Sequence, residues 1–78
     1  MSRAAKTLAQ MKANALDWRI ETLKSVADAY GVIWRQPGGS HVIFRHPRGA
    51  MLSVPARRPI KPVYISKFVR LIEEGMSE

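Results

Sequence analysis

His41 is the residue of this chain whose type and surroundings point most directly to chemistry. It follows Gly39 and Ser40 in a short turn and opens the run His-Val-Ile-Phe-Arg-His. An imidazole takes up and returns a proton near neutral pH, and a glycine turn lets a ligand come close to the backbone. Residue types alone favour a binding site here over a catalytic one, and they leave proton transfer open.

Basic residues without acidic ones occupy the middle of the chain. The net charge is +7, and no Asp or Glu occurs between Asp28 and Glu73. That window contains Arg35, Arg45, Arg48, Arg57, Arg58, Lys61, Lys67 and Arg70. A field of one sign over a small domain attracts a polyanion. A nucleic-acid ligand is therefore favoured over a merely solvated basic surface.

The cysteine and histidine content predicts a site with no metal, and no organic cofactor is expected. The chain has no cysteine that would supply a thiolate ligand. Side chains alternate along a strand, so His41 and His46 should lie on opposite faces. They are poor candidates for two ligands of one metal ion or for a paired acid and base.

Two helices are predicted, one on each side of a β-rich segment. The first has Asn14 or Asp17 as plausible starts and Gly31 as its end. The second begins at Pro62 and ends at Gly75. Their apolar faces, at helical spacing, comprise Leu23, Val26, Ala27 and Tyr30, then Ile65, Phe68, Val69 and Ile72.

Three strands are predicted between these helices. Residues 32–36, 41–46 and 50–54 are rich in β-branched and aromatic side chains, and turns at 37–40 and 47–49 separate them. The expected fold is α+β in the order α-β-β-β-α, with a three-stranded antiparallel sheet packed on two helices.

The chain is expected to form one domain over residues 16–78, preceded by an N-terminal extension over residues 1–15. In that extension Leu8 and Met11 are a weak apolar pair. No apolar run approaches the roughly 20 residues of a membrane helix, and the N-terminus lacks the apolar core of a signal peptide. We expect a cytoplasmic protein.

Strand parity places His41 relative to the sheet. Phe44 is the largest apolar side chain of the second strand and should face the helices. His41, Ile43 and Arg45 then share the open face of the sheet. The basic, proline-rich stretch 55–62 should be a loop, because its prolines do not suit a central strand or a helix interior.

The stretch GSHVIF, residues 39–44, resembles the G-S-H-x-x-F motif of the HicA toxins, the small ribonucleases of HicA/HicB toxin–antitoxin pairs. The similarity continues through His46-Pro47, Val54-Pro55 and Lys61, and it covers residues 20–74. The chain departs from the family pattern after the Val-Pro pair, where many relatives have a histidine and this chain has Arg57.

The resemblance implies a fold like that of a double-stranded-RNA-binding domain. It also implies metal-free cleavage of mRNA with His41 as the catalytic residue, and silencing by a HicB-type antitoxin protein. RNA carries its own nucleophile, the 2′-hydroxyl, so His41 would act as general base and would later return the proton. The residues expected to bind RNA are Gly39, Ser40, Arg45, Arg57, Arg58 and Lys61.

Aromatic residues offer stacking surfaces for bases. Trp18, Trp34 and Tyr64 are the candidates, although a core position is favoured for Trp34 and Tyr64. His46, which precedes Pro47, is expected to be structural.

The antitoxin is expected to cover the open sheet face at His41, Ile43 and Arg45. Two other functions stay open. The first is an RNA-binding module that cuts nothing, which substitution of His41 would distinguish from a nuclease. The other is a DNA-binding regulator. It ranks last of the three functions, because no predicted helix combines a basic face with a helix-turn-helix partner.

Overall fold

The predicted order of elements is found, with one more helix in front of it. The computed structural model describes residues 3–75; residues 1–2, which begin the predicted extension, and 76–78, which end the predicted domain, lie outside that range. The elements are α1 (Arg3–Ala13), α2 (Ile20–Ala29), β1 (Ile33–Arg35), β2 (His41–Arg45), β3 (Met51–Pro55) and α3 (Pro62–Glu74).

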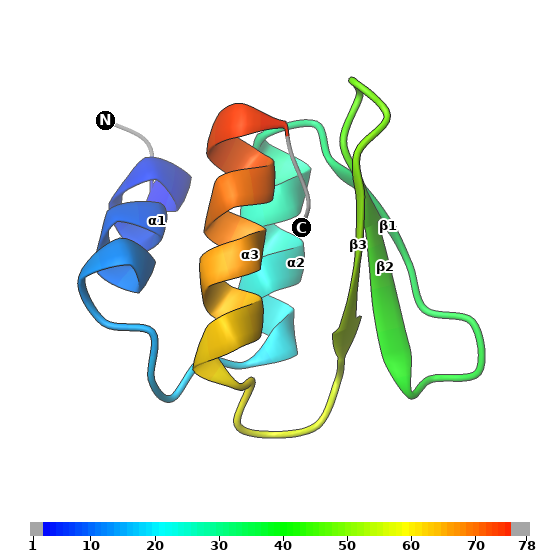
Figure 1. Cartoon of the computed structure of the whole chain (residues 1–78), viewed down its shortest axis with the longest axis horizontal. Coiled ribbons are helices and arrows are strands. Elements are labelled where there is room, and N and C mark those ends of the chain that lie inside the picture. Colours follow the sequence, from blue (N-terminus) through cyan, green and yellow to red (C-terminus); the bar gives the residue numbers. More distant parts are fainter. Residues whose placement is uncertain (1–2, 76–78) are drawn as a thin grey trace.

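The described elements form three layers, seen edge-on in Figure 1. The sheet lies on one side, α2 and α3 cover one of its faces, and α1 packs on the far side of this helix pair. The other face of the sheet carries no helix. The α+β architecture predicted from the sequence is thus confirmed, with α-α-β-β-β-α as its full order.

The sheet is an antiparallel meander in the order β1-β2-β3. Opposite residues include Trp34 and Phe44 between β1 and β2, and Val42 and Val54 between β2 and β3. Val42 and Phe44 are fully buried, while His41 is exposed. The predicted parity of β2 is therefore confirmed, and His41 lies on the open face.

The core between the layers is apolar throughout, because no polar or charged residue is buried among residues 3–75. Phe44 of β2 and Phe68 of α3 meet edge to face, with ring centroids 5.0 Å apart. Aromatic pairs favour this arrangement. It fixes α3 against the centre of the sheet.

The end of α2 is a Schellman motif. Val32 N–H donates to the carbonyl of Ala27 at 2.9 Å, and Gly31 has φ 73°. This left-handed turn lets Val32 enter the core. The prediction that Tyr30 belongs to the buried face of α2 is wrong: Tyr30 is the C-cap and is 41% exposed, because the chain leaves the helix there.

The start of α2 also differs from the prediction. The helix begins at Ile20 after Arg19, and neither Asn14 nor Asp17 caps it. Asn14 instead accepts a hydrogen bond from Leu16 N–H through Oδ1, at 3.0 Å. Local side-chain bonds of this kind compete with helix capping. By contrast, α3 begins at Pro62 and ends at left-handed Gly75, as predicted.

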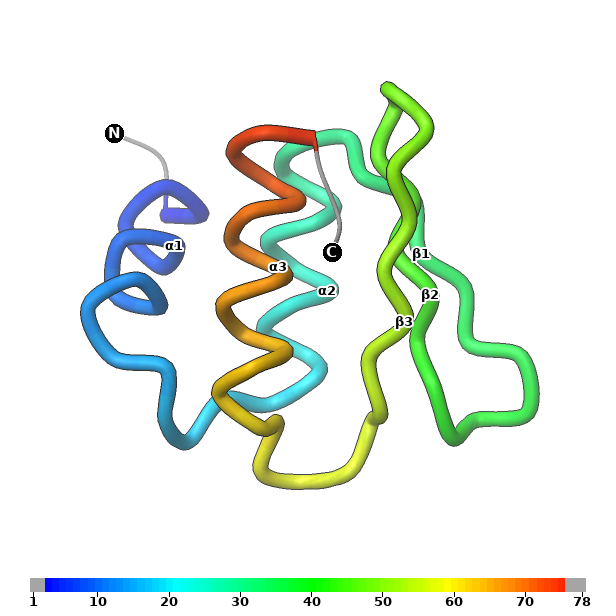
Figure 2. The backbone as a smooth tube through the Cα atoms, in the orientation of Figure 1, coloured from blue at the N-terminus to red at the C-terminus, as the bar shows by residue number. Residues whose placement is uncertain are grey.

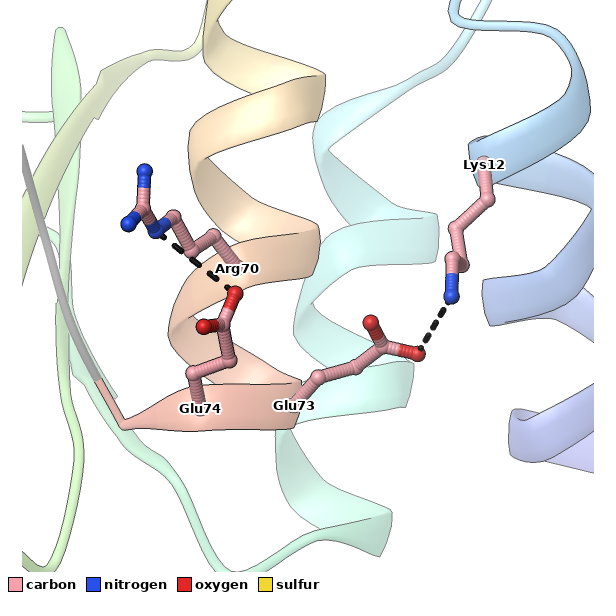
Figure 3. A network of polar contacts seen from close by, with 4 residues as sticks. All are labelled: Lys12, Arg70, Glu73 and Glu74. Carbon is pink, nitrogen blue, oxygen red and sulfur yellow. Dashed lines mark hydrogen bonds and ion pairs between the residues drawn. The ribbon is translucent and has the colours of Figure 1, made fainter.

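The predicted extension contains α1, and its apolar pair enters the core. Leu8 and Met11 are 4% and 1% exposed. On the surface Lys12 Nζ lies 3.1 Å from Glu73 Oε2 of α3, and Arg70 pairs with Glu74 along α3 (Figure 3). Exposed ion pairs contribute little to stability, so apolar burial is what holds α1 in place. No helix within residues 3–75 has the length and apolar character needed to cross a membrane.

Candidate active site and nucleic-acid interface

His41 stands at one end of the sheet, at the first position of β2. The turn before it and the loop between β3 and α3 both lie at this end of the molecule, as the tube in Figure 2 shows. Gly38 and Gly39 have φ values of 73° and 80°. Side chains other than glycine are strained in this region of φ, so the two glycines permit the tight turn that leads into His41.

A polar network braces the turn from outside. Gln36 Nε2–H donates to the carbonyl of Gly39 at 2.9 Å, and Lys24 Nζ donates to Gln36 Oε1 at 2.6 Å. Lys24 also lies 4.5 Å from the centre of the Trp34 ring. Trp34 in turn donates its indole N–H to Asp28 Oδ1 at 2.9 Å. The turn is thereby tied to α2 through side chains rather than through the sheet alone.

The imidazole of His41 has a neighbour of its own in the turn. Ser40 Oγ lies 3.2 Å from His41 Nδ1. When Nδ1 carries the proton and donates it to Oγ, Nε2 is left as the acceptor. Ser40 therefore favours an orientation in which one ring nitrogen is occupied and the other is available to a ligand.

His41 lines a hollow of about 550 Å³, which we call the His41 hollow. It is lined by Gly39, Ser40, His41, Pro55, Ala56 and Arg57. A second hollow of about 180 Å³, the Tyr64 hollow, is lined by Pro55, Arg57, Pro59, Lys61 and Tyr64. Pro55 and Arg57 line both, so the two hollows adjoin.

The loop that carries Arg57 is fixed at both ends. Ala56 N–H donates to the carbonyl of Ser40 at 3.0 Å, which joins the loop to the His41 turn. Ile60 N–H donates to the carbonyl of Trp18 at 3.0 Å, and the Arg58–Pro59 peptide bond is cis. Trp18 is half-buried and donates its indole N–H to the carbonyl of Asn14 at 2.7 Å. It lines neither hollow.

Most of the predicted RNA-binding residues are brought together around these hollows, but two are not. Arg58 lies 3.4 Å from Glu21 of α2 in an exposed ion pair and lines neither hollow. Arg45 is four residues along β2 from His41, which at about 3.3 Å per residue amounts to about 13 Å. Arg45 therefore lies along the strand from the His41 hollow and does not line it.

Arg45 belongs to a second group on the open sheet face. In register across the strands, Ile33 and Met51 flank Arg45, while Arg35 and Ser53 flank Ile43. Ile33 and Met51 are 64% and 52% exposed. A groove of about 350 Å³ is lined by Ile33, Arg35, Pro37, Ile43, Arg45 and Met51. If the register of the three strands had been known from the sequence, strand parity would have placed Ile33 and Met51 on the open face beside Arg45.

The second histidine lies apart from this site. His46 follows β2 at the end of the strand opposite His41, and its Nδ1 accepts the N–H of Arg48 at 3.1 Å. It also lies against Gly75, where an added Cβ would come within 2.9 Å of the ring. No three histidine or carboxylate side chains gather as a metal site within residues 3–75.

Tyr64 combines the two positions predicted for it. It is half-buried and packs against the core, as the favoured interpretation predicts, and it also lines a hollow that adjoins the His41 hollow. Its place in the first turn of α3, directly after the basic loop, was the signal in the sequence for this position.

Comparisons of the chain with protein-family models, curated proteins and solved structures found no match.

Proposed function

We propose that this protein is an endoribonuclease that cleaves mRNA in the cytoplasm without a metal, with His41 as general base and acid. The observation that carries the proposal is the His41 hollow. An exposed imidazole with one nitrogen beside Ser40 Oγ shares this hollow with the guanidinium-bearing Arg57. The similarity of residues 39–44 to the HicA toxin motif supports the same reading and suggests a toxin that inhibits translation.

The proposed reaction uses the nucleophile within the RNA. His41 Nε2 takes the proton of a 2′-hydroxyl, whose oxygen attacks the adjacent phosphorus. The bond from phosphorus to the 5′-oxygen breaks, and that oxygen receives a proton from His41. Negative charge grows on the phosphate meanwhile, and Arg57, with Lys61 in the adjoining hollow, stabilises it. The products are a 2′,3′-cyclic phosphate and a 5′-hydroxyl.

Substitution of His41 tests the proposal. His41→Ala should abolish cleavage of a single-stranded RNA, and the fold should persist because His41 is exposed and outside the core. His46→Ala is the matched control and should still cut. Circular dichroism verifies folding, and mapping of the fragment ends with EDTA present identifies the chemistry. A folded His41→Ala variant that cuts at the original rate, or fragments ending in a 3′-hydroxyl, would refute the mechanism.

The rival function is an RNA-binding module without catalysis. The basic residues around the hollows support RNA binding in either case, so binding alone does not separate the two functions. Growth inhibition on expression does. It should disappear with His41→Ala if cutting is the cause, whereas a pure binder would keep it.

A HicB-type antitoxin is the partner that we propose for the open sheet face. The residues expected at its interface are His41, Ile43 and Arg45, and exposed Ile33 and Met51 extend the apolar surface. Apolar contact over Ile43 with acidic groups opposite Arg45 would complement this face, and would keep RNA from His41.

Ile43→Asp tests the partner. It should weaken the complex strongly, because a carboxylate would be buried without a partner. Gln10→Asp, on exposed α1 surface, is the control and should bind as the original does. An interface mapped by hydrogen exchange to the helices alone would contradict the prediction, as would unchanged affinity in the Ile43→Asp variant.

A further inference from the structure

The Tyr64 hollow combines apolar walls with a cationic rim. The rings of Pro55, Pro59 and Tyr64 form its walls, while exposed Arg57 and Lys61 contribute the charge. Tyr64 packs against the core, which restricts the movement of its ring before any ligand arrives. A rigid aromatic surface next to cations is the arrangement on which single-stranded nucleic acids stack their bases.

The size of the hollow limits its ligand. Its volume is about 180 Å³. An apolar cavity of about 150 Å³ in another protein holds one benzene molecule. The Tyr64 hollow therefore has room for a single planar base.

Position links this hollow to the reaction. It shares Pro55 and Arg57 with the His41 hollow, so a nucleotide in one is a neighbour of the phosphate in the other. The first turn of α3 contains no acidic residue and starts beside Lys61. The positive end of the helix dipole thus adds to the attraction for a phosphate at the rim.

We propose that the Tyr64 hollow is a subsite for one unstacked nucleobase, adjacent to the phosphate that the 2′-hydroxyl attacks in the His41 hollow. This rests on RNA being the ligand, as in the proposed function, and it names the substrate class as single-stranded RNA. A base paired in a duplex is stacked between its neighbours and does not enter such a hollow. Arg57, which borders both hollows, would then contact the attacked phosphate next to the nucleotide whose base is bound.

A binding experiment that needs no cleavage tests the subsite. The probe is a short 2′-O-methyl oligonucleotide, which cannot supply the attacking hydroxyl, compared with an abasic oligonucleotide of equal length. Anisotropy gives the ratio of their affinities for each variant. Tyr64→Leu should reduce this ratio by about 5- to 150-fold, the usual strength of stacking on one base. Tyr64→Phe should keep the ratio, because the aromatic face remains.

Tyr30→Leu is the control, since Tyr30 is the other tyrosine of the chain and lies exposed at the end of α2. An unchanged ratio in folded Tyr64→Leu would overturn the subsite, as would an equal loss in Tyr30→Leu. Failure of the subsite leaves cleavage by His41 intact. Conversely, if Tyr64→Leu lowers the affinity ratio but the original protein cuts no RNA, the subsite stands and the nuclease is rejected. If no oligonucleotide binds at all, both proposals fall.

Discussion

At the scale of single residues, the contact between Ser40 and His41 decides how the imidazole is presented. Ser40 Oγ lies 3.2 Å from Nδ1, and His41 has an exposed side chain with freedom to rotate. A neutral hydrogen bond is worth about 0.5–1.5 kcal/mol. This is enough to favour one orientation of the ring without locking it, so in the proposed mechanism Ser40 is a positioning residue and His41 is the catalytic one.

Ser40→Ala should therefore lower the cleavage rate by about 2- to 10-fold, in proportion to that hydrogen bond. Single-turnover kinetics on a short RNA measures the effect. Ser53→Ala, an exposed serine of the same sheet face, serves as control and should cut normally. A loss as complete as that of His41→Ala would assign Ser40 a direct chemical role, and no loss would remove its positioning role.

At the scale of elements, the turn before β2 depends on a contact from α2. Gln36 joins Lys24 of α2 to the carbonyl of Gly39, with distances of 2.6 and 2.9 Å. A turn with two glycines in left-handed conformations has many alternatives when unfolded or loosened. The bracing side chains restrict it to the form that places Ser40 beside His41.

Gln36→Ala should loosen this turn and slow cleavage by about 2- to 10-fold, because each of its two bonds is worth about 1 kcal/mol. The melting temperature should fall by about 4–8 °C for each kcal/mol lost. Gln36→Glu keeps the acceptor for Lys24 but loses the donor to Gly39, and should show the same defect. Gln10→Ala on α1 is the matched control. Hydrogen exchange at Gly39 measures the loosening, and exchange as slow as in the original protein would contradict the role.

The helix α1 provides a second test at this scale. Met11 is 1% exposed between α1 and the α2–α3 pair. Met11→Ala should lower the free energy of unfolding by about 2–5 kcal/mol through lost burial and a cavity. Lys12→Ala, which removes only an exposed ion pair, should cost about 1 kcal/mol or less. Urea unfolding measures the loss of stability in both variants. A loss in Met11→Ala as small as that in Lys12→Ala would show that α1 contributes little to the stability of the domain.

At the scale of the whole molecule, the apolar periodicities were sufficient to predict the α+β order and the open face of β2. They failed where a contact is local or long-range rather than periodic. Asn14 bonds Leu16 N–H instead of capping α2, and a Schellman turn leaves Tyr30 exposed. The loop that lines the Tyr64 hollow is joined to Trp18 through Ile60, 42 residues away in sequence. No periodicity encodes a contact at that separation.

Arg57 and Lys61 line the hollows near His41, and the salt dependence of RNA binding should report their contacts with phosphate. Each phosphate neutralised on a single strand contributes about −0.7 to the slope of log K against log salt. Arg57→Ala should flatten the slope by about that amount, because Arg57 borders both hollows.

The other arginines provide the comparison. Arg58→Ala should flatten the slope less, because Arg58 is paired with Glu21 at 3.4 Å. Arg48→Ala, in the turn at the opposite end of β2, should leave it unchanged. Titration of the 2′-O-methyl oligonucleotide at several salt concentrations measures all three. A flattening by Arg48→Ala equal to that by Arg57→Ala would mean that RNA is held by the overall charge of +7 rather than by the end that carries His41.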